Sequence, residues 1–477
     1  MNNRSLMKRI AGRALAACAL AAAGGCALGP EYRRPALEMP ATYRDEATLP
    51  GQAVAADWWT LYNDAALNEL VAQVLATNSD ARIAAAQVDE AEAVLRQVNA
   101  GFFPQLDLGG GASRSRVSAD TDVPLNANAP LIRNDRRLTV STAFELDFWG
   151  KLRRGSEAAR AQALASAYGR EVVRLTLAGT TTQAWFSLHA LDAQIAALRD
   201  SVRTREESLE VVKSRAAAGY ASDLELNQAV GARADAAAQL TELQRQRSGV
   251  ENLLAALSGR AELRVAAGDI RDLPLPPLPP PGLPSALLDR RPDIRVAEQN
   301  LVAANAQIGV ARAALFPTIS LTGNYGGQSS ALQHLLDSGA RIWSGGFALS
   351  LPIFDAGRNL ARVDQVEARR QQALFAYQKA IAVAFREVAD AIVNTSQSAR
   401  AETDLTIRRD SARNSLELAQ LRYQSGYSGY LEVLDAQRSA NDAELALARN
   451  RQSQLAYSVD FFKALGGGWT APPRPGP

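Results

Sequence analysis

The chain contains few of the residues from which disulfides and metal sites are built: two cysteines and two histidines among 477 residues. A disulfide framework or a Cys/His metal cluster needs more such residues than this. Acidic and basic side chains are nearly equal in number, 50 against 52, and no basic stretch of the kind found in nucleic-acid binders dominates the chain. We therefore expect no metal, no cofactor and no nucleic-acid partner.

The signatures of an energy source and of catalysis are also missing. The sequence contains no G-x-x-x-x-G-K-[ST] phosphate loop and no series of long apolar segments of the kind found in transporters. The two histidines, His189 and His334, stand alone, and we expect each to be a packing or surface residue. We predict no catalytic residue and no enzyme activity.

The N-terminal segment has the features of a secretory signal. Residues 1–25 begin with basic side chains, continue with a short apolar run and end in small residues from Ala23 to the position before Cys26. These small residues resemble the lipobox of bacterial lipoproteins, whose cysteine is acylated, although that motif has Leu where Ala23 stands. Cys18 fits the motif better but would leave almost no apolar segment. We therefore predict a lipid on Cys26 and, because Ala27 is not Asp, transport to the outer membrane.

Two segments of the chain resemble each other. The Asp-x-Arg and Phe-Pro motifs of residues 79–108 recur in residues 292–321, and Gly219-Tyr220 recurs as Gly426-Tyr427. The proline-rich stretch between the segments excludes helix and central strand. We interpret this pattern as an internal duplication. The chain then divides into a signal peptide at 1–25, an N-terminal anchor and equatorial segment at 26–78, a first repeat at 79–272, a Pro-rich connector at 273–284, a second repeat at 285–468 and a C-terminal tail at 469–477.

Each repeat contains a pair of segments in which apolar and polar residues alternate, as in β-strands. The clearest are residues 138–148 and 343–353, and weaker segments precede them at 106–112 and 319–325. A length of roughly ten residues suits a tilted strand that crosses a bilayer, although a half-buried soluble sheet gives the same pattern. Four strands cannot close a barrel, and an open edge is costly in lipid. In a membrane, two or three copies would have to complete the barrel, and the sequence does not choose between these numbers.

The rest of each repeat has the periodicity of long helices. Apolar side chains within residues 184–202 and 374–391 recur at alternating spacings of four and three, which is typical of helices that pack along one stripe. No proline interrupts residues 151–273 or 353–471. A helix over residues 151–218 would be about 100 Å long. Each repeat is therefore predicted to run helix, two strands, very long helix, turn and long helix.

These features together resemble the outer-membrane efflux proteins of the TolC superfamily, and in particular their NodT/OprM-like lipoprotein branch. The resemblance covers essentially the whole mature chain and rests on the combination of residues 26–35 (CALGPEYRRP), 57–70, 290–294 (RRPDI), 351–358 (LPIFDAGR) and 430–438 (YLEVLDAQR). It implies an α+β membrane protein. Three chains would share a twelve-stranded outer-membrane β-barrel, four strands from each, continuous with a twelve-helix periplasmic α-barrel inside an equatorial belt.

The resemblance also implies a function and partners. Members of the family are passive channels of tripartite pumps, through which small toxic molecules or drugs leave the cell. A homotrimer would lie among outer-membrane lipids of a Gram-negative bacterium, anchored by its lipid, and extend into the periplasm. There it would meet a periplasmic adaptor, or membrane fusion protein, which joins it to an inner-membrane RND-type transporter.

Two sets of site residues follow from the resemblance. The turns between the long helices would form the tip where the adaptor docks, with Arg215, Gly219, Tyr220, Arg422, Tyr423, Gly426 and Tyr427. Glycine suits these turns because a helix end often needs a left-handed residue. Leu431 and Asp435, on one helix face, resemble the periplasmic gate, an apolar ring and an acidic ring whose carboxylates repel unless a cation or basic residue relieves them. The first repeat contributes Leu224 but has Gln228, so the acidic ring would come from the second repeat.

Two alternatives remain open at this point. The same architecture could serve as an exit duct for type I protein secretion or for metal efflux, although the chain has only three methionines. A protein of a different class, a soluble periplasmic coiled-coil scaffold with a small sheet, would show the same periodicities.

Overall fold

The computed structural model describes residues 27–36, 54–118, 120, 130–280 and 284–469. The predicted signal peptide and Cys26 lie outside these residues. The chain forms two compact units, one made of Met1–Pro35, Val88–Ser166 and Ala297–Tyr377, the other of Ala36–Gln87, Ala167–Val296 and Gln378–Pro477. Among the described residues, no helix has both the length and the apolar character needed to cross a membrane.

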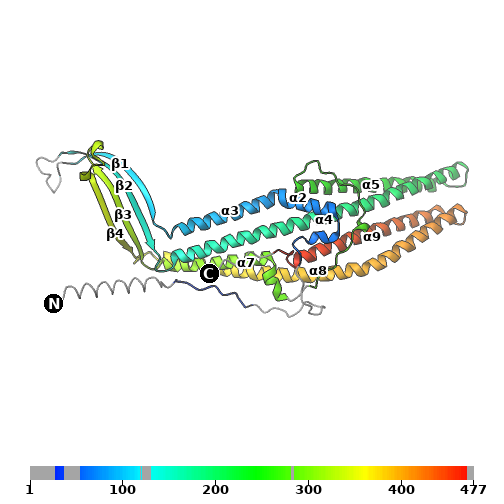
Figure 1. Ribbon diagram of the computed structural model, residues 1–477. Coiled ribbons are helices and arrows are strands. Elements are labelled where there is room, and N and C mark those ends of the chain that lie inside the picture. Colours follow the sequence, from blue (N-terminus) through cyan, green and yellow to red (C-terminus); the bar gives the residue numbers. More distant parts are fainter. Residues whose placement is uncertain (1–26, 37–53, 119, 121–129, 281–283, 470–477) are drawn as a thin grey trace. The chain divides into compact units, whose positions relative to one another are not determined.

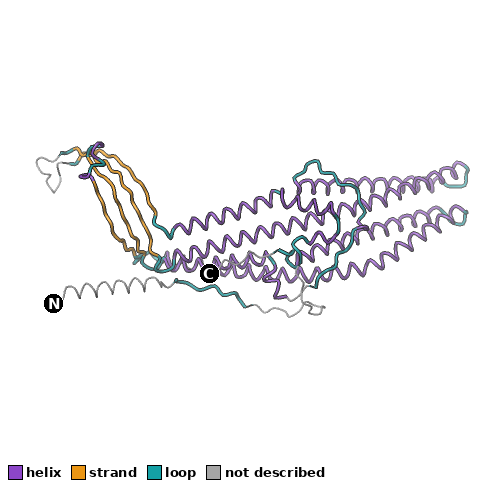
Figure 2. Tube along the Cα trace, in the orientation of Figure 1, coloured by secondary structure: helices purple, strands orange, loops and turns teal. Residues whose placement is uncertain are grey.

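The first unit contains one antiparallel sheet (Figures 1 and 2). Its strands, in spatial and chain order, are β1 (Gln105–Arg116), β2 (Ile132–Leu146), β3 (Thr318–Ser329) and β4 (Arg341–Ser350). The pairing of β2 with β3 joins the two repeats, and Phe144 lies opposite Leu321. Large apolar side chains on the strands are more than half exposed, namely Leu106, Leu108, Tyr325, Trp343, Phe347 and Leu349.

Two strands end earlier than the alternation predicts. The pattern extends to Phe148 and Ile353, but β2 ends at Leu146 and β4 ends at Ser350. Pro352 explains the second difference, because proline has no N–H group to donate to a neighbouring strand.

The helices follow the predicted order, and the order occurs twice. The first series is α3 (Ser79–Ala100), β1, β2, α4 (Lys151–Ala217) and α5 (Asp223–Ser258). The second series is α7 (Pro292–Ala313), β3, β4, α8 (Arg358–Gln424) and α9 (Tyr430–Ala464). Helices α4 and α8 have 67 residues each, which corresponds to about 100 Å. The predicted stripe is buried: Leu191, Ile195 and Leu198 of α4 pack with Leu243 of α5.

Short elements complete the chain: η1 (Trp58–Tyr62), α2 (Ala65–Thr77), η2 (Ile270–Asp272), η3 (Pro284–Ala286), α6 (Leu287–Arg290), η4 (Leu332–His334) and η5 (Ser338–Ala340). Trp58 is fully buried in the second unit and stacks on Phe462 at 5.5 Å between ring centroids. Asp64 caps α2 by accepting hydrogen bonds from the backbone N–H groups of Ala66 and Leu67. These contacts pack η1 against α9 and fix the start of α2.

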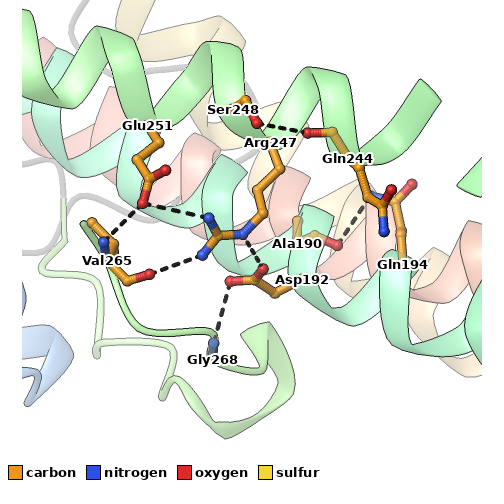
Figure 3. A network of polar contacts seen from close by, with 9 residues as sticks. All are labelled: Ala190, Asp192, Gln194, Gln244, Arg247, Ser248, Glu251, Val265 and Gly268. Atoms are coloured by element: carbon orange, nitrogen blue, oxygen red, sulfur yellow. Dashed lines mark hydrogen bonds and ion pairs between the residues drawn. The ribbon is translucent and has the colours of Figure 1, made fainter. Parts of the chain in front are cut away.

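An extended segment, residues 260–273, follows α5, and we call it the strap. Figure 3 shows the polar network that holds it. The Arg247 guanidinium donates to Asp192 at 2.5 Å and to the carbonyl oxygen of Val265 at 2.9 Å. The backbone N–H of Val265 donates to Glu251, and that of Gly268 donates to Asp192. Charged side chains of α4 and α5 therefore form hydrogen bonds with backbone groups of the strap. These backbone groups have no partner within a helix or a sheet.

Candidate functional site: the two hairpin tips

Both long hairpins turn through the same glycine motif. Gly219 has φ +78° and Gly426 has φ +81°, the left-handed conformation predicted for these positions. After α4, the N–H groups of Gly219 and Tyr220 donate to the carbonyls of Ala216 and Arg215 at 3.0 and 2.8 Å. This is a Schellman motif, which satisfies the carbonyls left free at a helix end. The N–H groups of Gly426 and Tyr427 make the same two bonds after α8.

The helices that follow the turns begin in different ways. Ser222 and Glu225 form a capping box at the start of α5, in which each side chain accepts from the other residue's backbone N–H. At the start of α9, Gly429 provides no side-chain cap. Instead, Tyr430 is fully buried at the first helical position. Apolar packing therefore positions the start of α9, whereas a capping box positions the start of α5.

A small apolar cluster joins the two hairpins near their ends. It contains Leu209, Val212, Ala229, Ala419, Tyr423, Tyr430 and Val433. The rings of Tyr423 and Tyr430 lie 5.5 Å apart. Burial raises the pKa of both phenols, so both stay neutral at physiological pH. The tip of each chain is therefore a packed unit.

Arg215 crosses from the first hairpin to the second. Its guanidinium donates to the carbonyl oxygen of Tyr423 at 3.0 Å and lies 4.7 Å from the centre of the Tyr423 ring. Tyr423 is only 6% exposed. We expected both residues on a docking surface, but Tyr423 lies inside the tip.

The other predicted tip residues are exposed. Tyr220 is 79% and Tyr427 81% exposed, one at each turn. Arg422 is also exposed, and its guanidinium lies 3.6 Å from the Glu432 carboxylate. Two aromatic rings and a partly neutralised cation therefore face outward from the described surface of each chain.

The predicted gate residues follow the turns directly. Leu224 and Leu431 occupy equivalent positions in α5 and α9, and both side chains are about two-thirds exposed. Asp435, one turn beyond Leu431, is exposed and accepts a hydrogen bond from Arg438 at 2.8 Å. We had not identified Arg438 as a partner of this carboxylate. Its position three residues along the same helix is the signal that predicts such a pair.

The two histidines lie where the sequence suggests. His189 is buried on α4, and its ring meets that of Trp185 edge-on at 4.7 Å. His334 is exposed and lies 2.8 Å from the Asp337 carboxylate.

Comparison with known proteins identifies the family. The model of the family described as outer membrane efflux protein matches residues 70–260 and 283–467. The chain belongs to this family. Outer membrane protein OprJ of Pseudomonas aeruginosa is 36% identical over 94% of each chain, and the cation efflux system protein CusC of Escherichia coli is 33% identical over 95% of this chain and 98% of its own. The chain is therefore an outer-membrane channel component of an efflux system. The family resemblance seen in the sequence is confirmed, and it excludes the alternative of a soluble scaffold.

Solved structures of the efflux family share the fold. A crystal structure of a membrane protein from Pseudomonas aeruginosa has a TM-score of 0.85 with 34% identity, and covers 94% of this chain and 99% of that one. The open state of the MtrE outer membrane channel of Neisseria gonorrhoeae has a TM-score of 0.81 with 28% identity, with coverage of 94% and 99%. The efflux protein is thus mostly helical with one sheet, as these channels are.

Proposed function

We propose that three copies of this chain form the outer-membrane duct of a tripartite efflux pump. The observation that carries the proposal is the open sheet: within the described residues, β1 and β4 each have a neighbouring strand on one side only. In lipid, the free N–H and C=O groups of these edges would cost several kcal/mol each. Pairing β1 of one copy with β4 of the next satisfies them and closes a twelve-stranded barrel.

The long helices continue the same duct. Each copy supplies α4, α5, α8 and α9, so three copies provide twelve helices for a periplasmic α-barrel. Apolar stripes hold α4 against α5, and the largely Ala, Ser, Gln, Arg and Glu surface suits a wall with neighbours at its sides and water inside. The remaining short elements would form the equatorial belt.

The hairpin tips would be both gate and docking surface. Leu224, Leu431 and Asp435 would face the pore, where the Asp435–Arg438 pair reduces repulsion among three carboxylates. The exposed Tyr220 and Tyr427, with Arg422, Gly219 and Gly426 beside them, would meet a periplasmic adaptor. The adaptor joins the duct to an RND-type transporter in the inner membrane, which supplies the energy.

The cargo is proposed to be small toxic molecules or drugs. Relatives of similar identity carry different names: the toluene efflux pump protein TtgF of Pseudomonas putida is 35% identical, and the cation efflux protein CusC is 33% identical. We infer that selectivity resides mainly in the inner-membrane transporter, and metal efflux is the second candidate because of the CusC relationship.

A lipid on Cys26 is proposed to anchor each copy. Residues just after Cys26 are held firmly within the first unit, where the Leu28 N–H donates to the Trp149 carbonyl at 3.1 Å. Gly29 has φ +96°, and a side chain there would collide with the backbone of Gly309. These contacts hold the chain in place just after Cys26, the residue to which the lipid would be attached.

Conductance of the purified, unheated protein in planar bilayers tests the duct and its gate. We expect discrete current steps that become larger in Leu431→Ala and in Asp435→Ala, since each change removes one ring of the constriction. Leu253→Ala, a half-exposed α5 position far along the hairpin, should match the wild type. Unchanged conductance in both gate variants would remove the gate assignment, and no current from any inserted protein would contradict the duct.

A further inference from the structure

The second unit contains a pocket that the duct mechanism does not use. It lies among α2, α4 and the strap and has a volume of about 380 Å³. Its apolar wall includes Leu70 of α2, Trp185 of α4 and Leu263 of the strap, all buried. The volume is within the range of sites that bind small organic molecules.

His189 of α4 contributes to the same wall. It is 8% exposed, and its ring meets that of Trp185 edge-on at 4.7 Å. Both ring nitrogens are shielded from solvent, and the backbone of Gly268 in the strap packs against the ring. The imidazole therefore contributes ring surface to the wall, and its nitrogens are not open to a ligand.

The mouth of the pocket carries two available cations. Arg260 and Arg264 of the strap line it, and within the described residues neither guanidinium forms an ion pair. Their bonds are to neutral oxygens, the Gln73 side chain at 3.4 Å and the Leu263 carbonyl at 3.0 Å. Arginine pairs readily with carboxylates through parallel N–H donors.

The two carboxylates of the lining differ in availability. Asp64 is fully engaged, since it accepts from the Trp185 indole N–H at 2.8 Å and from two backbone N–H groups of α2. Glu69 is exposed on α2 and has no ion pair among the described residues. The lining therefore carries two guanidiniums and two carboxylates, but the Asp64 oxygens are already occupied by neutral N–H donors of the protein, whereas the two guanidiniums have no ion pair among the described residues.

We propose that this pocket binds a small amphipathic organic anion. The apolar body of the ligand lies against Trp185, Leu70 and Leu263, and its carboxylate pairs with Arg260 and Arg264. Because both arginines belong to the strap while the apolar wall belongs largely to α2 and α4, the bound anion fastens the strap to these helices.

Fluorine NMR of para-trifluoromethylbenzoate with the full assembled protein in nanodiscs tests this proposal. The fluorine line should broaden with protein, while neutral para-trifluoromethylbenzamide should broaden far less. Loss of a charge-assisted bond should make Arg264→Gln bind about tenfold more weakly. Glu69→Gln should bind more tightly, because it removes a like charge.

The opposite signs of these two changes separate charge recognition from general damage. The matched control is Arg233→Gln on α5, away from the pocket. It breaks an exposed ion pair with Glu206 of α4 and should bind as the wild type does. Equal broadening by benzoate and benzamide, the absence of broadening, or an unchanged affinity in Arg264→Gln would overturn the proposal.

Discussion

At the scale of single residues, the tips depend on two glycines whose backbone other residues rarely adopt. A Cβ added at Gly219 or Gly426 would meet no atom within 4 Å. Any penalty of substitution therefore comes from the left-handed backbone itself and not from a collision.

Replacing either glycine with alanine isolates that penalty. We expect Gly219→Ala and Gly426→Ala each to lower stability by about 1 kcal/mol, because alanine is strained at positive φ. Gly231 in α5 is the matched control: it also has open space around it, but within a helix alanine should stabilise by about 0.5–1 kcal/mol. Thermal unfolding followed by circular dichroism measures both effects. A destabilised Gly231→Ala, or unaffected tip variants, would contradict this explanation of the turns.

His189 should make stability depend on pH. Burial lowers its pKa, against the opposing effects of Asp192, Asp64 and the Gly268 backbone and with a smaller effect of Arg247 in the same direction. The unfolded chain therefore binds a proton below about pH 6.5 while the folded chain resists it. Stability should fall as the pH drops through this range, and His189→Gln should reduce that loss.

His334→Gln provides the comparison for this titration. That ring is exposed beside Asp337, so the variant should keep the wild-type fall in melting temperature between about pH 7.5 and 5.5. If His189→Gln kept the same fall, the buried imidazole would not be its source.

At the scale of elements, the strap shows how irregular backbone is held in place. Its contacts depend on Arg247, whose charge lies between Asp192 and Glu251. The Asp192 side chain is 6% exposed, so removal of the guanidinium leaves a buried carboxylate without its counter-ion.

We expect Arg247→Ala to lower the free energy of unfolding by about 3–5 kcal/mol. Adding Asp192→Asn should recover part of this loss, because the stranded charge is then gone. Arg245→Ala is the control, since Arg245 forms an exposed pair with Glu242 on the same helix, and its effect on stability should be much smaller. Equal losses in the two arginine variants would show that the network does not hold the strap.

The elements themselves could be predicted from the sequence where one physical period dominates. The stripe from Leu191 to Leu198 and the glycine turns depend on local spacing, and the α4 end was predicted one residue beyond Ala217. Alternation alone does not give the strand ends, because it continues past Pro352 although β4 ends at Ser350.

Contacts between distant segments could not be predicted in this way. Arg215 and Tyr423 belong to different repeats, and Arg247 meets a strap that has neither helical nor strand periodicity. The burial of Tyr423 is likewise decided by the partner hairpin. Sequence spacing indicates which face of its own helix a residue occupies, but not which side chain of another element covers it.

At the scale of the whole molecule, the account depends on the two sheet edges. Two repeats give β1 to β4, and the register of β2 with β3 leaves β1 and β4 outermost. The proposed position of the sheet in the outer membrane rests on the family relationship and on the exposed apolar side chains of these strands. A single copy in lipid would leave both edges unpaired, which makes assembly a condition for stability.

Native mass spectrometry of the protein released from nanodiscs tests this most directly. Three chains in every complex are predicted, since three sheets of four strands complete the barrel. A complex that contains one chain, with the protein folded and inserted, would contradict the account.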